Sequence, residues 1–151
     1  MKKTIIIFMI IYYSLIIWSF SSHPAEVSAK ESKSITGIIY DKFAVYIEKF
    51  SDMGKEEFVN KTDSFIRKCA HFTLFFIFAL IISMYVECYH KSALEFLLTV
   101  FLTGVIFAVS DEVHQLFVPG RGCQMRDVLI DSNGVLAGGI LFLATKRSVG
   151  K

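Results

Sequence analysis

Four long apolar runs, separated by polar segments, dominate the hydropathy pattern of this chain. They cover residues 4–20, 69–89, 93–109 and 128–145. Each comes close to the ~20 apolar residues that a helix needs to cross a bilayer. Only three polar residues, 90–92, separate the second run from the third, and such a short connection makes two helices antiparallel neighbours. We therefore predict an all-α fold, a four-helix transmembrane bundle that forms a single membrane domain over residues 1–151.

The polar segment between the first two runs carries a different pattern. Its first part, residues 21–34 (SSHPAEVSAKESKS), is rich in serine and charge, so we predict an exposed linker there. Farther along, apolar residues recur at helical spacing while charged residues take the other positions. These apolar residues are Ile39, Phe43, Tyr46, Ile47, Phe50 and Met53. The pattern predicts an amphipathic helix. This helix lies on the membrane surface or caps the bundle, or it packs on the rest of the protein as in a soluble domain.

The first apolar run admits two interpretations. Lys2 and Lys3 precede it, and Val27, Ser28 and Ala29 form a small-residue motif that suits cleavage of a signal peptide. We favour a retained membrane anchor, because the run is longer than the ~7–15 residue core of a signal peptide. An aromatic residue near the end of the run, Trp18, also suits the membrane interface.

Composition agrees with a membrane protein and excludes other classes. Hydrophobic residues make up 54% of the chain and the mean hydropathy is +0.53, which is too apolar for an ordinary soluble domain. The net charge of +2, without a basic patch among exposed aromatic residues, argues against nucleic-acid binding. The three cysteines lack CxxC spacing, so we interpret them as free thiols. The lipid bilayer is the partner that composition predicts, and composition leaves the cofactor unknown.

Polar side chains gather around the junction between the third and fourth runs, in SDEVHQLFVPGRGCQMRDVLID (residues 110–131). Pro119 ends the third helix, because proline cannot donate to the helical ladder. Since each span reverses side, the start of the second span, the end of the third and the start of the fourth share one membrane face. The polar residues at this face are Arg67, His71, Asp111, Glu112, His114, Gln115, Arg121, Arg126, Asp127 and Asp131.

Helical spacing indicates how these residues meet. One stripe of the third span carries Gly104, Ala108, Asp111 and Gln115, and a stripe of the fourth span repeats the spacing with Asp127, Asp131, Gly134 and Gly138. Small residues let helix backbones approach closely. We therefore predict that the third and fourth spans pack through these stripes and bring Asp111 towards Asp131, with His114 near Asp111.

Three roles are open for the polar cluster. A charge at the bilayer centre costs ~2.5–3.5 kcal/mol on insertion scales, so such groups pair, bind a ligand or face water. The cluster could be a salt-bridged cap that fixes helix register. It could hold a divalent metal through His71, Asp111, His114 and Asp131. It could also bind the phosphate or carboxylate of a lipid-linked envelope precursor through an arginine fork, with His114 or an acid as general base.

These roles divide the polar residues into two sets of candidates. The catalytic candidates are Asp111, Glu112 and His114. The candidates for ligand binding are Arg67, His71, Gln115, Arg121, Arg126, Asp127 and Asp131. Whether the protein is an enzyme is left open by the sequence.

Three segments resemble successive motifs of the VanZ-like family: FSSHPAEVSAKES, FIRKCAHFTLFFIFAL and FAVSDEVHQLFVPGRGCQMRDVLIDSNGVLAGG. The resemblance implies a small four-helix bacterial membrane protein of the cell envelope, related to a protein linked to low-level teicoplanin resistance. It places the recurrent polar positions of the family on Arg67, Lys68, His71, Asp111, Glu112, His114, Gln115, Arg121, Asp127 and Asp131. The chain departs from the family pattern at Leu74, where an acid is frequent, and at Asn133, where an apolar residue is usual. The first departure weakens any mechanism that needs that acid.

We predict an envelope protein whose polar cluster faces the outside and binds or modifies a lipid-linked or wall-linked anionic molecule. The alternative is a non-catalytic scaffold, whose cluster only holds the bundle and whose amphipathic helix meets a partner. We expect both termini in the cytoplasm, because the first helix usually sets the orientation. The distribution of lysine and arginine opposes this orientation, since the outer side would then hold more of them.

Overall fold

The computed structural model describes residues 2–50, 54–89 and 92–149. These residues form five helices and no strand: α1 (Lys2–Ser21), α2 (Ala25–Phe50), α3 (Lys55–Val86), α4 (Ala93–Gln115) and α5 (Met125–Val149). The prediction of an all-helical fold is confirmed. The four helices α1, α3, α4 and α5 are long and apolar enough to cross a membrane.

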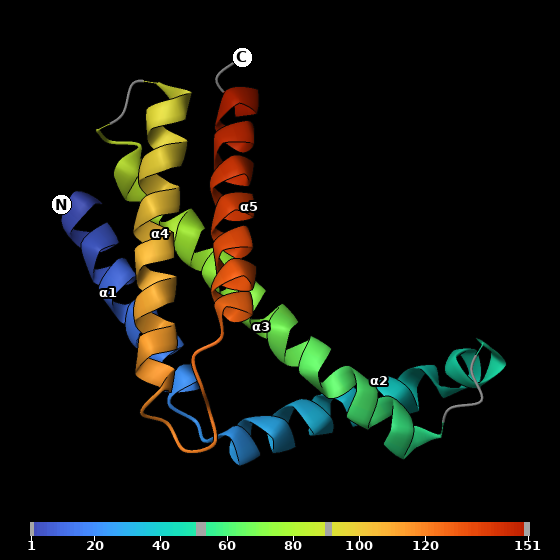
Figure 1. Cartoon of the computed structure of the whole chain (residues 1–151). Coiled ribbons are helices and arrows are strands. Elements are labelled where there is room, and N and C mark those ends of the chain that lie inside the picture. The colour runs from blue at the N-terminus through green and yellow to red at the C-terminus, as the bar shows by residue number, and fades with distance from the viewer. Residues whose placement is uncertain (1, 51–53, 90–91, 150–151) are drawn as a thin grey trace.

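The helix α3 organises the bundle. It crosses the upright helices α4 and α5 at an angle, whereas α1 slants in the same general direction as α3, and α2 runs out beside the N-terminal half of α3 (Figure 1). It contacts each of the other four helices, and its residues Phe75, Phe78 and Ala79 are almost wholly buried. The core is completed by side chains from α1, α4 and α5, among them Ile17 and Val135.

The outer faces of the bundle are apolar. On α4, Leu94, Leu98, Leu102 and Ile106 follow one another at intervals of one helical turn, and each is at least half exposed. Exposed apolar side chains in a continuous stripe are unfavourable in water and favourable in hydrocarbon. This stripe therefore fits a helix that faces lipid in a multi-pass membrane protein.

Polar contacts hold the helices together at both ends of the bundle. At the end where α1 begins and α5 ends (Figure 1), Lys146 lies 2.6 Å from Glu87, and the Lys3 ammonium lies 4.2 Å from the ring centre of Tyr89. At the opposite end, the loop after α4 is fastened to the start of α2, because Ala25 donates its backbone N–H to the carbonyl of Pro119 at 3.2 Å. The polar cluster lies at this second end.

The helix α2 begins earlier than expected. Residues 25–34 were predicted to be an exposed linker, and this prediction is wrong, because the helix starts at Ala25. Pro24 and Glu26 give the segment a proline before the helix and an acid in its first turn, which are signals of a helix start. The segment also packs against α3, where Ser32 donates a hydrogen bond to Asp63.

The helix α2 does not pack on the rest of the protein through its predicted apolar face. Phe43 and Tyr46 are exposed, at 47% and 66%, and the side chains of Phe50 and Met53 lie outside the described residues. The helix instead buries Ser32, Thr36 and Tyr40, which are spaced at one turn. The alternative in which the helix packs through its apolar face, as in a soluble domain, is therefore wrong for Phe43 and Tyr46.

The close approach of helices involves a different pair from the one predicted. A Cβ atom added at Gly134 or Gly138 would lie 2.5 Å from a backbone carbonyl of α3, that of Phe72 or Phe76. The glycine stripe of α5 therefore packs on α3, and the prediction that it packs on α4 is wrong. The stripe of α4 does face α5, since Gly104 lies against Val135.

Candidate functional site

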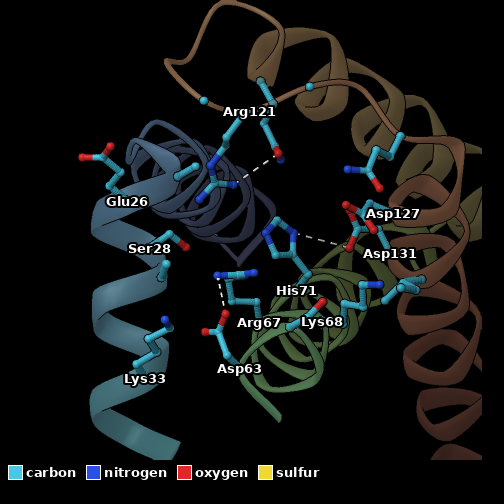
Figure 2. A pocket seen from close by; sticks show the side chains of 18 residues that line it. Glu26, Ser28, Lys33, Asp63, Arg67, Lys68, His71, Arg121, Asp127 and Asp131 are labelled. Carbon is cyan, nitrogen blue, oxygen red and sulfur yellow. Dashed lines mark hydrogen bonds and ion pairs between the residues drawn. The ribbon is translucent and has the colours of Figure 1, made fainter. Parts of the chain in front are cut away.

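A pocket of about 520 Å³ lies at the polar end of the bundle. Its walls come from the first turns of α2, the N-terminal half of α3, the end of α4, the loop before α5 and the first turns of α5. Arg121, His71 and Arg67 follow one another across it, between α2 on one side and Asp127 and Asp131 of α5 on the other (Figure 2). We call Lys33, Arg67, Lys68 and Arg121 the basic residues of the pocket.

Two acids lie among these basic residues. Arg67 pairs with Asp63 one turn earlier on α3, with 3.0 Å between Nη1 and Oδ2. Asp63 also accepts the hydrogen bond of Ser32, so it joins α2 to α3. Glu26 lines the pocket from the first turn of α2. The Asp63–Arg67 pair therefore fixes this wall and uses part of the arginine's hydrogen-bonding capacity.

Arg121 is held by neutral groups. Its Nε donates to the backbone carbonyl of His23 at 2.9 Å, and its Nη1 donates to Oε1 of Gln115 at 3.2 Å. Within the described ranges, no carboxylate forms an ion pair with it. Burial lowers the pKa of its guanidinium from the usual value, while the negative charge of Asp111 acts in the opposite direction. Arg121 remains charged, because arginine is not deprotonated in proteins.

Asp111 lies at the centre of a hydrogen-bond network that crosses three segments. It is fully buried, and its Oδ2 accepts from Ser21 of α1 at 2.8 Å and from Gln115 at 2.9 Å. Gln115 in turn accepts from Arg121. The network therefore connects the end of α1, the end of α4 and the loop before α5, and it orients Asp111 through one carboxylate oxygen only.

His71, Asp111 and Asp131 converge at the inner side of the pocket. One ligand atom from each lies within 4.8 Å of the others. His71 Nδ1 and Asp131 Oδ1 are 3.6 Å apart, which is longer than a hydrogen bond. Asp131 is fully buried, and neither of its oxygens accepts a hydrogen bond from a described residue. The predicted approach of Asp111 to Asp131 is thus present in the structure, and His71 lies with them.

The remaining acids at the start of α5 and the end of α4 are close to this group. Glu112 is buried, and its Oε2 accepts the backbone N–H of Gln124 at 2.8 Å, which fastens the loop to α4. Asp127 lines the pocket one turn before Asp131. Arg126, by contrast, is exposed and does not line the pocket.

His114 is separated from the pocket. Its Nε2 lies 3.0 Å from the hydroxyl of Ser22, and its ring stacks on Trp18 with 5.5 Å between ring centres. Both partners belong to α1 or to the residue after it. The predicted metal set therefore divides in the structure: His71, Asp111 and Asp131 come together, whereas His114 contacts α1.

The first turns of α2 form part of the pocket that sequence reasoning missed. Ala25, Ser28, Ala29 and Lys33 line it, although the segment that contains them was predicted to be a linker. Asp63 and Ser64 were also missed, because the second span was expected to begin only at residue 69. The helix-start signal at Pro24 and Glu26 could have placed the α2 residues on a helix, but no signal in the sequence indicates the contact between Ser32 and Asp63.

Comparison with known proteins identifies the family. A family model described as VanZ/LLP1 matches residues 4–146, nearly the whole chain. No curated protein and no solved structure matches the chain. The matched range includes the five helices almost completely, together with every residue of the pocket. The chain therefore belongs to the VanZ-like family and has the apolar helices of a multi-pass membrane protein.

Proposed function

We propose that the pocket binds the phosphate or carboxylate group of a lipid-linked or wall-linked envelope molecule, and that this binding contributes to teicoplanin resistance. The observation that supports this proposal is the position of Arg121. It is a partly buried guanidinium that faces a pocket and has no carboxylate partner among the described residues. A buried charge without a counter-charge is costly, and an anionic ligand would supply the missing partner.

The geometry of arginine suits such a ligand. A guanidinium presents five N–H donors in a fixed fork that matches phosphate and carboxylate groups. Arg121 uses Nε and one donor of Nη1 within the protein, so Nη2 is available to a ligand in the pocket. Lys33 and Lys68 line the same pocket and can add positive charge without fixed geometry.

The place of the pocket supports a ligand with a lipid tail. It lies where α1 and α4 end and α5 begins, at the polar end of the apolar helices (Figure 1). The boundary of the hydrocarbon core is expected at this level. Lipid phosphates occupy the same region of a bilayer. A lipid-linked molecule could therefore place its charged group in the pocket while its tail stays in the membrane.

Binding by the purified protein tests the proposal. The tag-free chain in detergent is titrated with a polyprenyl monophosphate, with the matching polyprenyl alcohol, and with a soluble wall peptide that carries carboxylates. We expect the phosphate or the peptide to bind and the alcohol not to bind. Arg121→Gln should weaken binding roughly ten- to hundredfold, because a hydrogen bond to a charged group contributes ~1.5–3 kcal/mol.

Arg126→Gln is the matched control. It removes the same charge five residues later, at the start of α5, but Arg126 is exposed and does not line the pocket. It should bind within about twofold of the parent, since an exposed charge contributes little. Equal loss in both variants, or equal binding of phosphate and alcohol, would refute the pocket as an anion site.

Resistance is tested separately in cells. Expression of the parent chain in a susceptible bacterium should raise the teicoplanin concentration that stops growth, and Arg121→Gln should abolish this effect at equal membrane abundance. Arg126→Gln should retain it. Full protection by Arg121→Gln would favour the alternative, in which the polar cluster is only a scaffold.

A further inference from the structure

We propose that His71, Asp111 and Asp131 form a binding site for one divalent transition-metal ion, such as Mn²⁺ or Zn²⁺, beside the anion-binding part of the pocket. The three residues come from α3, α4 and α5, the helices that meet at the inner side of the pocket. The site itself does not depend on the proposed function. Only the meeting of metal and anion, argued below, rests on it.

The distances suit a single ion. Metal–nitrogen and metal–oxygen bonds to histidine and carboxylate are about 2.0–2.2 Å long, so two ligands of one ion lie at most about 4.4 Å apart. The ligand atoms here lie within 4.8 Å of one another, and His71 Nδ1 and Asp131 Oδ1 are 3.6 Å apart. Small rotations of the carboxylates would therefore bring all three to one ion.

The atoms that face the site lack partners. Asp111 and Asp131 are both fully buried. Asp111 Oδ1, both oxygens of Asp131 and Nδ1 of His71 make no hydrogen bond to a described residue. Buried polar atoms are nearly always satisfied, and a missing ion is one explanation for exceptions. A metal ion would give a partner to one such atom from each of the three residues.

The hydrogen bonds around Asp111 also suit a metal ligand. Ser21 and Gln115 both donate to Oδ2, so the carboxylate is held in place while Oδ1 is left for the ion. Outer contacts of this kind orient the ligands of metal sites. Gln115 is itself held by Arg121, so the network that positions the metal ligand reaches the arginine of the anion site.

One basic side chain, that of His71, lies close to the two aspartates, and its contact is with Asp131. In the part of the chain that the structure describes, His71 is the only basic side chain within 4 Å of either carboxylate. Arg121, the next candidate, binds Gln115 and the backbone of His23. The rival to a metal is therefore a proton shared by the two acids, and the experiment below separates these explanations.

The donor types indicate the class of ion. Imidazole favours Zn²⁺ and similar transition metals, and carboxylates favour Mn²⁺ and harder ions. Three protein ligands leave at least one position open on such an ion. His71 and Asp131 line the pocket, so the open position faces it. If the proposed function holds, the anionic group would bind this position and Arg121 together.

Metal binding by the purified chain is the test. Tag-free protein in detergent is stripped with a chelator and dialysed against Mn²⁺ or Zn²⁺, and bound metal is measured by mass spectrometry and titration calorimetry. Mn²⁺ is included because the three exposed cysteines compete for Zn²⁺. We expect about one ion per chain for the parent. His71→Gln and Asp131→Asn should bind at least about tenfold more weakly, since even outer-shell losses cost ~10–100-fold.

Glu112→Gln is the matched control, because it removes a buried carboxylate from the residue after Asp111 without removing a ligand. It should bind metal within about twofold of the parent. Absence of stoichiometric binding by the parent would overturn the site and favour the shared proton. Unchanged binding by His71→Gln, or equal loss in Glu112→Gln, would overturn the ligand set. If Asp131→Asn fails to fold, His71→Gln decides, because its side chain is 22% exposed.

The two proposals fail separately. Arg121→Gln should retain metal and lose the anion, since Arg121 is not a ligand of the ion. Metal binding without anion binding would leave the metal site standing and refute the proposed function. Anion binding by a metal-free parent that takes up no metal would support the proposed function and refute the metal site.

Discussion

Replacement of Gly138 by alanine tests the packing of α3 against α5. The added Cβ would lie 2.5 Å from the carbonyl oxygen of Phe76 and 2.9 Å from Cβ of Ala79, and real Cβ atoms do not approach closer than 3.0 Å. The backbone of α3 cannot rotate away as a flexible side chain would. The helices must therefore separate by about half an ångström, and overpacking of this kind costs ~1–3 kcal/mol.

Two effects oppose each other in this variant. Alanine favours a helix over glycine by about 0.5–1 kcal/mol, which offsets part of the overpacking. We expect a net loss of unfolding free energy on the order of 1–2 kcal/mol. Gly37→Ala is the control, because its Cβ would meet only Cε of Lys55, at the ordinary distance of 3.8 Å. This variant should be as stable as the parent, or more stable by up to ~1 kcal/mol.

Reversible unfolding by SDS in mixed micelles, followed by circular dichroism, measures the free energy of each variant. Gly138→Leu should lose more than Gly138→Ala, because its side chain is larger. Equal stability of Gly138→Ala and the parent, with normal behaviour of Gly37→Ala, would refute the close contact between α3 and α5.

Three further predictions concern topology and the polar cluster. In single-cysteine chains, an impermeant thiol reagent applied to intact cells should label Cys123 but not Cys88, if both termini are cytoplasmic; the reverse pattern would invert the orientation, and equal labelling would contradict the four spans. His114→Gln should retain anion and metal binding within about twofold, because its ring contacts α1 rather than the pocket, and a loss of either by titration would return His114 to the site. Ser21→Ala should lower the unfolding free energy by about 1–3 kcal/mol, since it removes a buried hydrogen bond to Asp111; unchanged stability in SDS titration would show that this bond contributes nothing.

Two features could be predicted from the sequence: the membrane-spanning helices and the meeting of polar residues at one end of the bundle. Both are consequences of crossing a bilayer. Long helices need apolar residues throughout their hydrocarbon portion, and each span reverses the side of the chain. This rule places Arg67, Asp111 and Asp127 at the same end without knowledge of packing. This rule needs only that the number of spans is predicted correctly.

The partner of a helix stripe could not be predicted in this way. Small residues at one-turn spacing indicate that the backbone of another helix comes close, but the pattern does not identify which helix this is. Gly134 and Gly138 pack on α3, where Phe72 and Phe76 offer carbonyl groups. Likewise, Ser32 is polar in a polar segment, and only its contact with Asp63 makes it part of a helix interface.

The position of His114 has a simpler geometric cause. Successive residues of an α-helix turn by about 100°, so a residue three positions after Asp111 points about 60° away from it, and one four positions after points about 40° away on the other side. Gln115 is on the side that allows a hydrogen bond to Asp111. His114 is turned towards α1 instead.

The length of α3 affects how a ligand would reach the pocket. Its 32 residues span about 48 Å, against a hydrocarbon core of ~30 Å, so its polar N-terminal half and the neighbouring α2 extend past the core. A molecule with a lipid tail would meet this extension by diffusing in the plane of the leaflet. Its effective concentration there is set by confinement to the membrane rather than by the bulk solution. A contact that is weak for a soluble fragment would therefore be well occupied by the tethered molecule.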